Sequence, residues 1–112
     1  MNQAEFERRA AEILDSLFEQ IEDQLGDWLD VEMSAGILQI ELPDGGAYVV
    51  NKHAPNREIW VSSPKSGAWH FAPVEGGADD GAWRSTRGTE ELTALLAGEL
   101  AAASGRAVHL EL

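Results

Sequence analysis

The spacing of the apolar residues changes along the chain, and this change restricts the fold more than any other feature of the sequence. Between residues 3 and 25 the apolar side chains recur at steps of three and four, which places them on one face of an α-helix. From residue 29 onward the period is two, which is typical of strands with one buried face. The apolar stripe of the first helix comprises Phe6, Ala10, Ile13, Leu14, Leu17, Ile21 and Leu25.

Five or six strands are predicted, at about residues 29–34, 38–42, 48–51, 58–62, 68–72 and 82–85. The links between them are short, which favours antiparallel pairing because a parallel crossover needs a dozen or more residues. Two amphipathic helices and a half-apolar sheet bury their apolar surfaces together when both helices cover the same sheet face. We therefore predict an α+β two-layer sandwich, a single domain over residues 1–112, with a core that includes Leu17, Ile21, Leu38, Ile40, Leu95 and Leu96.

The second helix is predicted to follow Thr89, which is a suitable N-cap residue. Glu90 and Glu91 would then lie near the positive end of the helix dipole. Ser104 and Gly105 provide a stop signal for the helix. Beyond it, apolar residues alternate over residues 108–112, which indicates a short closing strand or a tail.

The charge of the chain excludes several classes of partner. A net charge of −12 over 112 residues argues against binding to nucleic acids or anionic membranes, since both need a cationic surface. An acidic domain attracts cations or basic protein surfaces instead. The absence of cysteine excludes disulfides and thiolate metal sites. No stretch of the sequence is apolar enough to span a bilayer.

Most of the acidic residues in the first half gather on one side of the predicted helix. Residues 10–51 contain ten Asp and Glu residues and no Lys or Arg. Five of these fall within a sector of roughly 100°, opposite the apolar stripe, and three more extend the row toward the first strand. The eight residues are Glu12, Asp15, Glu19, Glu22, Asp23, Asp27, Asp30 and Glu32.

Carboxylates in such a row repel one another, and no basic partner at i+4 offsets the repulsion. Their oxygens are hard ligands, suited to iron, Mg²⁺, Mn²⁺ or Ca²⁺. Because a convex helix face cannot wrap around an ion, any metal site there is expected to be shallow, solvated and weak. The alternative is that the row is only a solvated acidic surface, without a ligand.

The segment from residue 51 to residue 67 reads Asn-Lys-His-Ala-Pro-Asn-Arg-Glu-Ile-Trp-Val-Ser-Ser-Pro-Lys-Ser-Gly. It resembles the central signature of the frataxin family, and residues 91–96 of the second helix resemble that family to a lesser degree. The resemblance implies the same α+β sandwich, a role in iron–sulfur cluster assembly, and iron binding along the acidic row. Glu19, Glu22 and Asp23 are the positions that the resemblance supports best.

Trp60 lies between Ile59 and Val61, so if those two point into the core, the indole must point outward with Glu58. The opposite register would bury Trp60. In frataxins the matching Trp is exposed on the sheet and contacts the assembly machinery, which implies an outward Trp60. The resemblance extends this partner-binding surface to Asn51, Lys52, His53, Pro55, Asn56 and His70.

Two residues of this surface depart from the mitochondrial family pattern. His53 replaces the usual Gln, and His70 stands where mitochondrial frataxins carry an Arg used in docking. An imidazole cannot reproduce a bidentate Arg contact. The three histidines are too scattered in the sequence to suggest a shared metal site.

The resemblance leaves three functions open. The first is a regulator that binds the complex of cysteine desulfurase and iron–sulfur scaffold, and the second is a chaperone that delivers Fe²⁺ from the row. The third is a catalyst of iron oxidation, for which the sequence lacks the Glu-x-x-His pairing of di-iron enzymes. Weakly bound Fe²⁺ or Fe³⁺ is the expected ligand, and other divalent cations are expected to bind as well. We expect a monomer that oligomerises, if at all, with iron.

The start of the sequence bears on the location of the protein in the cell. The helical pattern begins within a few residues of Met1, so we expect no secretory or transit peptide and a bacterial cytoplasmic protein. A mitochondrial matrix location would require that a transit peptide had been removed.

Overall fold

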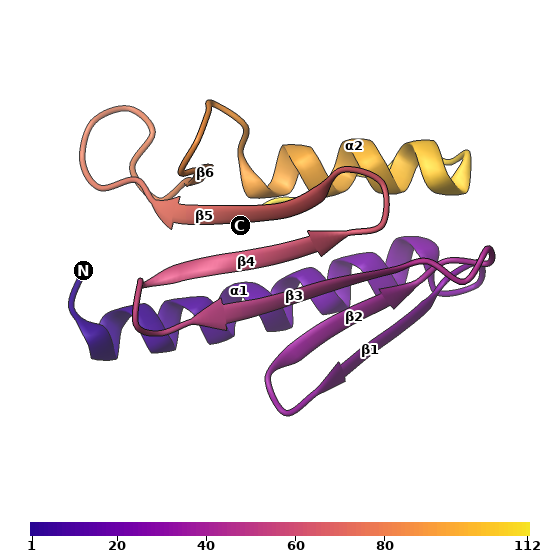
Figure 1. The fold of residues 1–112 in the computed structure, drawn as a ribbon, viewed down its shortest axis with the longest axis horizontal. Helices are drawn as coiled ribbons and strands as arrows, with labels where there is room; N and C mark the ends of the chain where they lie inside the picture. Colours follow the sequence, from indigo (N-terminus) through magenta and orange to yellow (C-terminus); the bar gives the residue numbers. More distant parts are fainter.

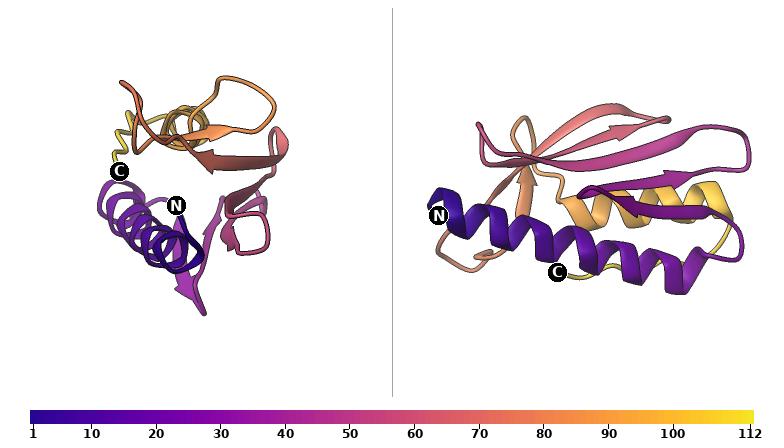
Figure 2. Two further views of the ribbon diagram at one scale, coloured as in Figure 1. Left: turned by 90° about the vertical axis from the view of Figure 1, so that its left-hand side faces the viewer. Right: turned by 90° about the horizontal axis from the view of Figure 1, so that it is seen from below.

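Two helices cover one face of a six-stranded antiparallel sheet in the computed structural model, which describes residues 1–112 (Figure 1). Figure 2 shows the two layers from the side, and in its right-hand view the helices lie below most of the sheet. The predicted α+β sandwich is confirmed. Neither helix combines the length and apolar character that a membrane crossing requires. The elements are α1 (Gln3–Leu25), β1 (Asp30–Ser34), β2 (Ile37–Glu41), β3 (Ala47–His53), β4 (Glu58–Ser63), β5 (Gly67–Pro73), β6 (Trp83–Ser85) and α2 (Leu92–Ser104).

Each strand pairs with the next one along the chain, so the sheet has the order β1-β2-β3-β4-β5-β6. The β1–β2 hairpin turns through Ala35 and Gly36, whose φ angles are 52° and 78°. Positive φ at both central residues matches the right-handed twist of paired strands. This tight turn fixes the register of the hairpin and brings Asp30 opposite Glu41.

The core lies between the helices and the inner face of the sheet. Five of the six residues predicted there are buried, namely Leu17, Ile21, Leu38, Ile40 and Leu96. Leu95 is half-buried and packs against the edge of the core. The reason is that the buried stripe of α2 consists of Leu92, Leu96 and Leu100, at steps of four, which leaves Leu95 on its flank.

The predicted N-cap of the second helix is wrong. The helix begins at Leu92, with Glu91 in the cap position, and no side chain caps it. Glu91 is extended and pairs with Arg84 in a β-bridge, and the Ser85 amide donates to the Glu90 carbonyl at 2.7 Å, while residues 86–89 form a turn and a bend. Thr89 therefore lies outside the helix.

The C-terminal segment is an extended tail and forms no strand. Two glutamines of α1 hold it by its backbone, in the way that a neighbouring strand would. The side-chain amide of Gln24 donates to the His109 carbonyl at 2.7 Å and accepts from the His109 amide at 2.9 Å. Gln20 makes the same two bonds with Glu111, at 2.7 and 2.9 Å. Leu110, between them, is buried against the core.

Truncation of Leu96 tests the position of α2. Leu96→Ala should lower the free energy of unfolding by about 2–5 kcal/mol, because the side chain is fully buried and its loss leaves a cavity. Leu95→Ala is the matched control and should cost clearly less, since Leu95 is only half-buried. Urea unfolding of the two variants measures both values, and equal losses would contradict this placement of the helix.

Candidate functional site

The acidic ridge consists of the eight carboxylates predicted as metal ligands, and all eight are exposed. Five of them lie on α1, on the side turned away from the sheet, because the opposite side of the helix is buried. Asp27 follows the end of the helix, and Asp30 and Glu32 lie on the edge strand β1. The ridge therefore runs along the helix and reaches the edge of the sheet.

Few positive charges neutralise the acidic ridge. Arg8 forms an exposed ion pair with Glu12 at 3.2 Å. This pair was not predicted, because Arg8 precedes Glu12 by four residues and only basic residues after each carboxylate were expected to offset the repulsion. None of the other seven carboxylates has an ion-pair partner. Glu22 and Asp23 lie in the last turns of α1, where the helix dipole disfavours negative charge and no basic residue follows.

The carboxylates of the ridge do not converge on a point. No group of three or more His, Asp or Glu side chains is arranged to hold a metal ion. The ridge is thus a row of separate carboxylates on a convex surface. Each of them, or a neighbouring pair, can offer one or two hard oxygen ligands to a hydrated cation.

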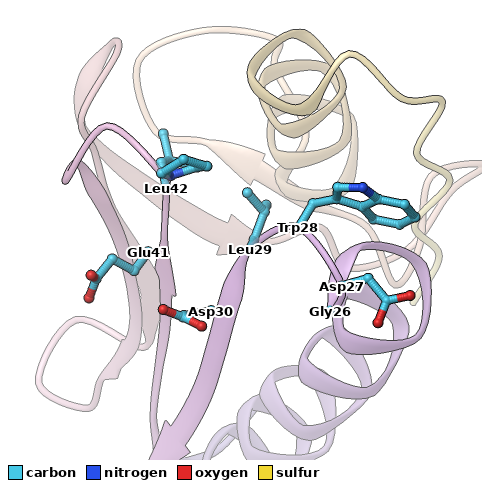
Figure 3. Close-up of a pocket in the computed structure, with 8 residues that line it drawn as sticks. Gly26, Asp27, Trp28, Leu29, Asp30, Glu41 and Leu42 are labelled. Atoms are coloured by element: carbon cyan, nitrogen blue, oxygen red, sulfur yellow. The ribbon is translucent and has the colours of Figure 1, made fainter.

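A shallow hollow of about 310 Å³ lies at the end of α1, and it adds one carboxylate that the sequence analysis did not include. Figure 3 shows the side chains of Asp30 and Glu41 next to each other on β1 and β2, whereas Asp27 points away from them. Glu41 is the cross-strand partner of Asp30. Paired residues in a tight hairpin lie at equal distances from its turn. The Ala35-Gly36 turn in the sequence could therefore have predicted that Asp30 and Glu41 are partners.

Trp60 points to the outer face of the sheet, away from the helices. Ile59 and Val61 on either side of it are buried in the core, as the alternation predicted. The acidic ridge on α1 and the indole of Trp60 therefore face opposite sides of the molecule. Trp60 is half-buried on the outer surface, because it has neighbours on both adjacent strands.

Two histidines stack on the two faces of the Trp60 ring. The imidazole of His53 on β3 lies with its centroid 3.7 Å from the indole centroid, at an interplanar angle of 9°. His70 on β5 covers the other face, at 4.2 Å and 7°. The indole N–H donates to a carboxylate oxygen of Glu58 at 2.8 Å. We call His53, Trp60 and His70 the aromatic ladder.

The remaining residues predicted for the partner-binding surface separate into two groups. Asn51 is the cross-strand neighbour of Trp60 and lies on the same outer face, while Pro55 and Asn56 are exposed in the β3–β4 turn. Lys52 belongs to the opposite face, because strand side chains alternate. It lines a small crevice with Asp15 on the helix side of the sheet.

Comparison with known proteins identifies the family. The sequence model of the frataxin-like domain matches residues 1–106 of the chain. The chain belongs to the frataxin family. It is 39% identical to the "Iron-sulfur cluster assembly protein CyaY" of Neisseria meningitidis, over 99% of this chain and 97% of that protein.

Solved frataxin structures show the same fold. The frataxin of Psychromonas ingrahamii superposes with a TM-score of 0.84 over the whole of both chains, at 20% identity. The trimeric frataxin of Saccharomyces cerevisiae, complexed with ferrous iron, superposes with a TM-score of 0.76 at 35% identity. That comparison covers 88% of this chain and 87% of the yeast chain.

The partly buried carboxylate of Glu99 on α2 links the helix layer to the signature segment, residues 51–67, through hydrogen bonds. It accepts hydrogen bonds from the hydroxyls of Tyr48 at 2.9 Å, Ser63 at 2.6 Å and Ser66 at 2.5 Å. Ser66 also accepts a bond from the Trp69 indole at 2.8 Å. The sequence contains a signal for this role, since Glu99 lies three and four residues after Leu96 and Leu95 and so borders the apolar stripe.

The network shifts the pKa values of two of its members. Partial burial alone would raise the pKa of Glu99, but bonds from the three hydroxyls outweigh it and hold the pKa below its ordinary value of 4.5. Burial, together with the bond to the Glu99 carboxylate, raises the pKa of Tyr48 to about 12. The folded protein therefore favours an ionised Glu99 and a neutral Tyr48.

These shifts predict the pH dependence of stability. The contribution of Glu99 is present above pH 4.5 and should be lost as pH falls through its lowered pKa, because unfolding then takes up a proton. The contribution of Tyr48 should be lost as pH rises from 10 toward about 12. Urea unfolding across the pH range measures both. Glu99→Gln should remove its share of the acid dependence, and Tyr48→Phe its share of the alkaline dependence. Profiles parallel to that of the native sequence would contradict the assignment.

Proposed function

We propose that this frataxin is a non-enzymatic accessory protein of iron–sulfur cluster assembly. It binds iron weakly on the acidic ridge and docks on the complex of cysteine desulfurase and scaffold through the face that carries Trp60. The name of the Neisseria relative supports the role in assembly. The observation that carries the rest is the presence of two separate surfaces. One is the row of carboxylates, all but Glu12 without an ion-pair partner, and its part on α1 faces the side opposite to the outward Trp60.

Iron is the cargo that the ridge suits best. Ferrous and ferric ions prefer hard oxygen ligands, and the ridge offers exposed carboxylates without competing basic side chains over most of its length. The yeast relative complexed with ferrous iron supports this choice. Because the carboxylates do not converge, binding should be weak, multi-site and shared with other hard divalent ions.

Docking should use the two surfaces for different purposes. The ridge holds eight of the 20 acidic residues in a chain with a net charge of −12. It should therefore steer a basic partner surface toward the protein. Trp60 with Asn51 on the outer face should supply the contact that sets the dissociation rate. We infer that the protein acts as a monomer in a bacterial cytoplasm.

An iron chaperone is the second candidate, because the exposed ridge carboxylates can carry Fe²⁺ without any contribution from Trp60. Ferroxidase chemistry is not favoured, since no group of side chains could hold two metal ions together. A titration against desulfurase and scaffold, with and without Fe²⁺, distinguishes a docking regulator from a chaperone. A chaperone should bind the complex only when it is loaded with iron.

Neutralising the centre of the ridge tests the iron site. The triple change Glu19→Gln, Glu22→Gln and Asp23→Asn should weaken Fe²⁺ binding measured by calorimetry. It should also raise the stability of the metal-free protein by about 0.2–0.5 kcal/mol for each like-charge pair removed. Both effects should shrink in high salt, because they act between exposed charges.

A charge-matched control separates the ridge from net charge alone. Glu7→Gln, Glu75→Gln and Glu90→Gln also remove three negative charges, and all three positions are exposed and lie outside the ridge. This control should retain iron binding. Equal loss in both triple variants, or no loss in the ridge variant, would show that the ridge is not the site.

Removal of the outward Trp tests docking. Trp60→Ala should weaken binding to the desulfurase–scaffold complex by at least about 2 kcal/mol, or roughly thirtyfold, as buried aromatic anchors do. The fold should survive, because the side chain lies outside the core and leaves no core cavity. Trp28→Ala is the control, since Trp28 is 44% exposed at the far end of α1. Biosensor kinetics measure both variants, and equal affinities would contradict docking through Trp60.

A further inference from the structure

In the aromatic ladder, the π-faces of Trp60, through which an indole usually contacts a partner, are not accessible. His53 and His70 cover both π-faces of the indole, at centroid distances of 3.7 and 4.2 Å. The ring N–H is already bonded to Glu58 at 2.8 Å. A partner can therefore reach only the outer edge of the indole, together with the edges of the two imidazoles beside it.

Hydrogen bonding does not explain where the two imidazoles lie. Nδ1 of His53 is inaccessible to solvent and has no hydrogen-bond partner. Nδ1 of His70 lies 3.7 Å from the Glu58 carboxylate, beyond hydrogen-bond distance. An unpaired buried nitrogen is costly, so the stacking contact must offset this cost. The position of both imidazoles is therefore explained by stacking on the indole, which each of them contacts face to face.

The strand register brings these three rings together. Trp60 pairs directly with His70 across β4 and β5 and with Asn51 across β3 and β4. His53 is the next outward residue after Asn51, and its ring reaches back over the indole, as a diagonal neighbour can. Rings from three adjacent strands therefore fix the plane of Trp60 in the middle of the outer face.

We propose that His53 and His70 are positioning residues that hold Trp60 upright for docking, so that the partner meets the edge of a rigid three-ring ladder. This inference rests on the proposed function, in which Trp60 is the docking anchor. The ladder suits a shallow apolar groove on the partner, which can receive ring edges. It does not suit an Arg or Lys that stacks on the indole, because both π-faces are covered.

Rigidity has a direct consequence for affinity. Immobilising a side chain at an interface costs about 0.5–1.5 kcal/mol, which a side chain that is already fixed avoids. If the histidines act in this way, their removal should weaken docking roughly twofold to tenfold, even though Trp60 itself remains. A ring of another kind at the same positions should preserve the effect, because stacking needs the ring and not its nitrogens.

The test therefore compares two double variants. His53→Ala with His70→Ala removes the flanking rings, whereas His53→Phe with His70→Phe keeps a ring on each side and removes every nitrogen. His109→Ala is the control, since His109 is exposed in the tail. The indole N–H signals of the four tryptophans in a ¹⁵N NMR spectrum report on the ladder, and Trp60→Phe identifies the Trp60 signal.

The Ala double variant should shift the Trp60 signal, increase the mobility of its indole, and weaken binding to desulfurase–scaffold roughly twofold to tenfold. The Phe double variant should keep a rigid indole and an affinity within about twofold of the native sequence. His109→Ala should change neither readout.

Three results would count against the inference. An unchanged indole signal in the Ala variant would show that the histidines do not position Trp60. Loss of affinity in the Phe variant equal to that in the Ala variant would show that the imidazole nitrogens contact the partner directly. Failure of the native protein to bind the complex would reject the proposed function and docking by the ladder together. In that case the indole signal, which needs no partner, would still decide whether the histidines hold Trp60.

Discussion

Packing of the two helices against one sheet face is the constraint on which both candidate surfaces depend. The inner face of the central strands is committed to the core through residues such as Val50, Ile59 and Val61. Because side chains alternate along a strand, Trp60 is then forced to the outer face. In the same way, burial of one side of α1 forces its carboxylates to the opposite side. A slip of one residue in β4 would bury the indole and expose the core, so the core fixes which side chains form the outer face.

The sequence was sufficient to predict features that depend on periodicity within one element. The first helix, the alternation in β4 and the exposed ridge are of this kind. The stacking of His53 and His70 on Trp60 was not predicted, because it depends on the register between three strands. That register is set by the turns between strands, and period alone does not specify it. The position of Lys52, by contrast, was predictable from the sequence. Alternation along the strand places Lys52 and its neighbour Asn51 on opposite faces of the sheet.

The carboxylates of the acidic ridge destabilise α1. Like charges repel along the ridge, and Glu22 and Asp23 lie at the unfavourable end of the helix dipole. Other contacts of the helix oppose this: a continuous apolar stripe is buried, and Gln20 and Gln24 bond to the backbone of the tail. Uncharged glutamines secure the tail without adding positive charge near the ridge. The helix is thus stabilised by contacts that leave its carboxylates free.

The opposite orientation of the two surfaces limits how a partner can bind. The ridge on α1 faces away from the sheet, and the aromatic ladder lies on the far side of that sheet, so no flat partner surface can cover both. The β1–β2 edge connects them, and it carries the exposed carboxylates of Asp30, Glu32 and Glu41. A partner that contacts both surfaces must therefore wrap around this edge. Otherwise two chains of one complex must each take one surface. In both arrangements the carboxylates of this edge lie between the two contact surfaces. In the proposed docking, these charges should then affect the association rate, and the aromatic residues of the outer face should affect the dissociation rate.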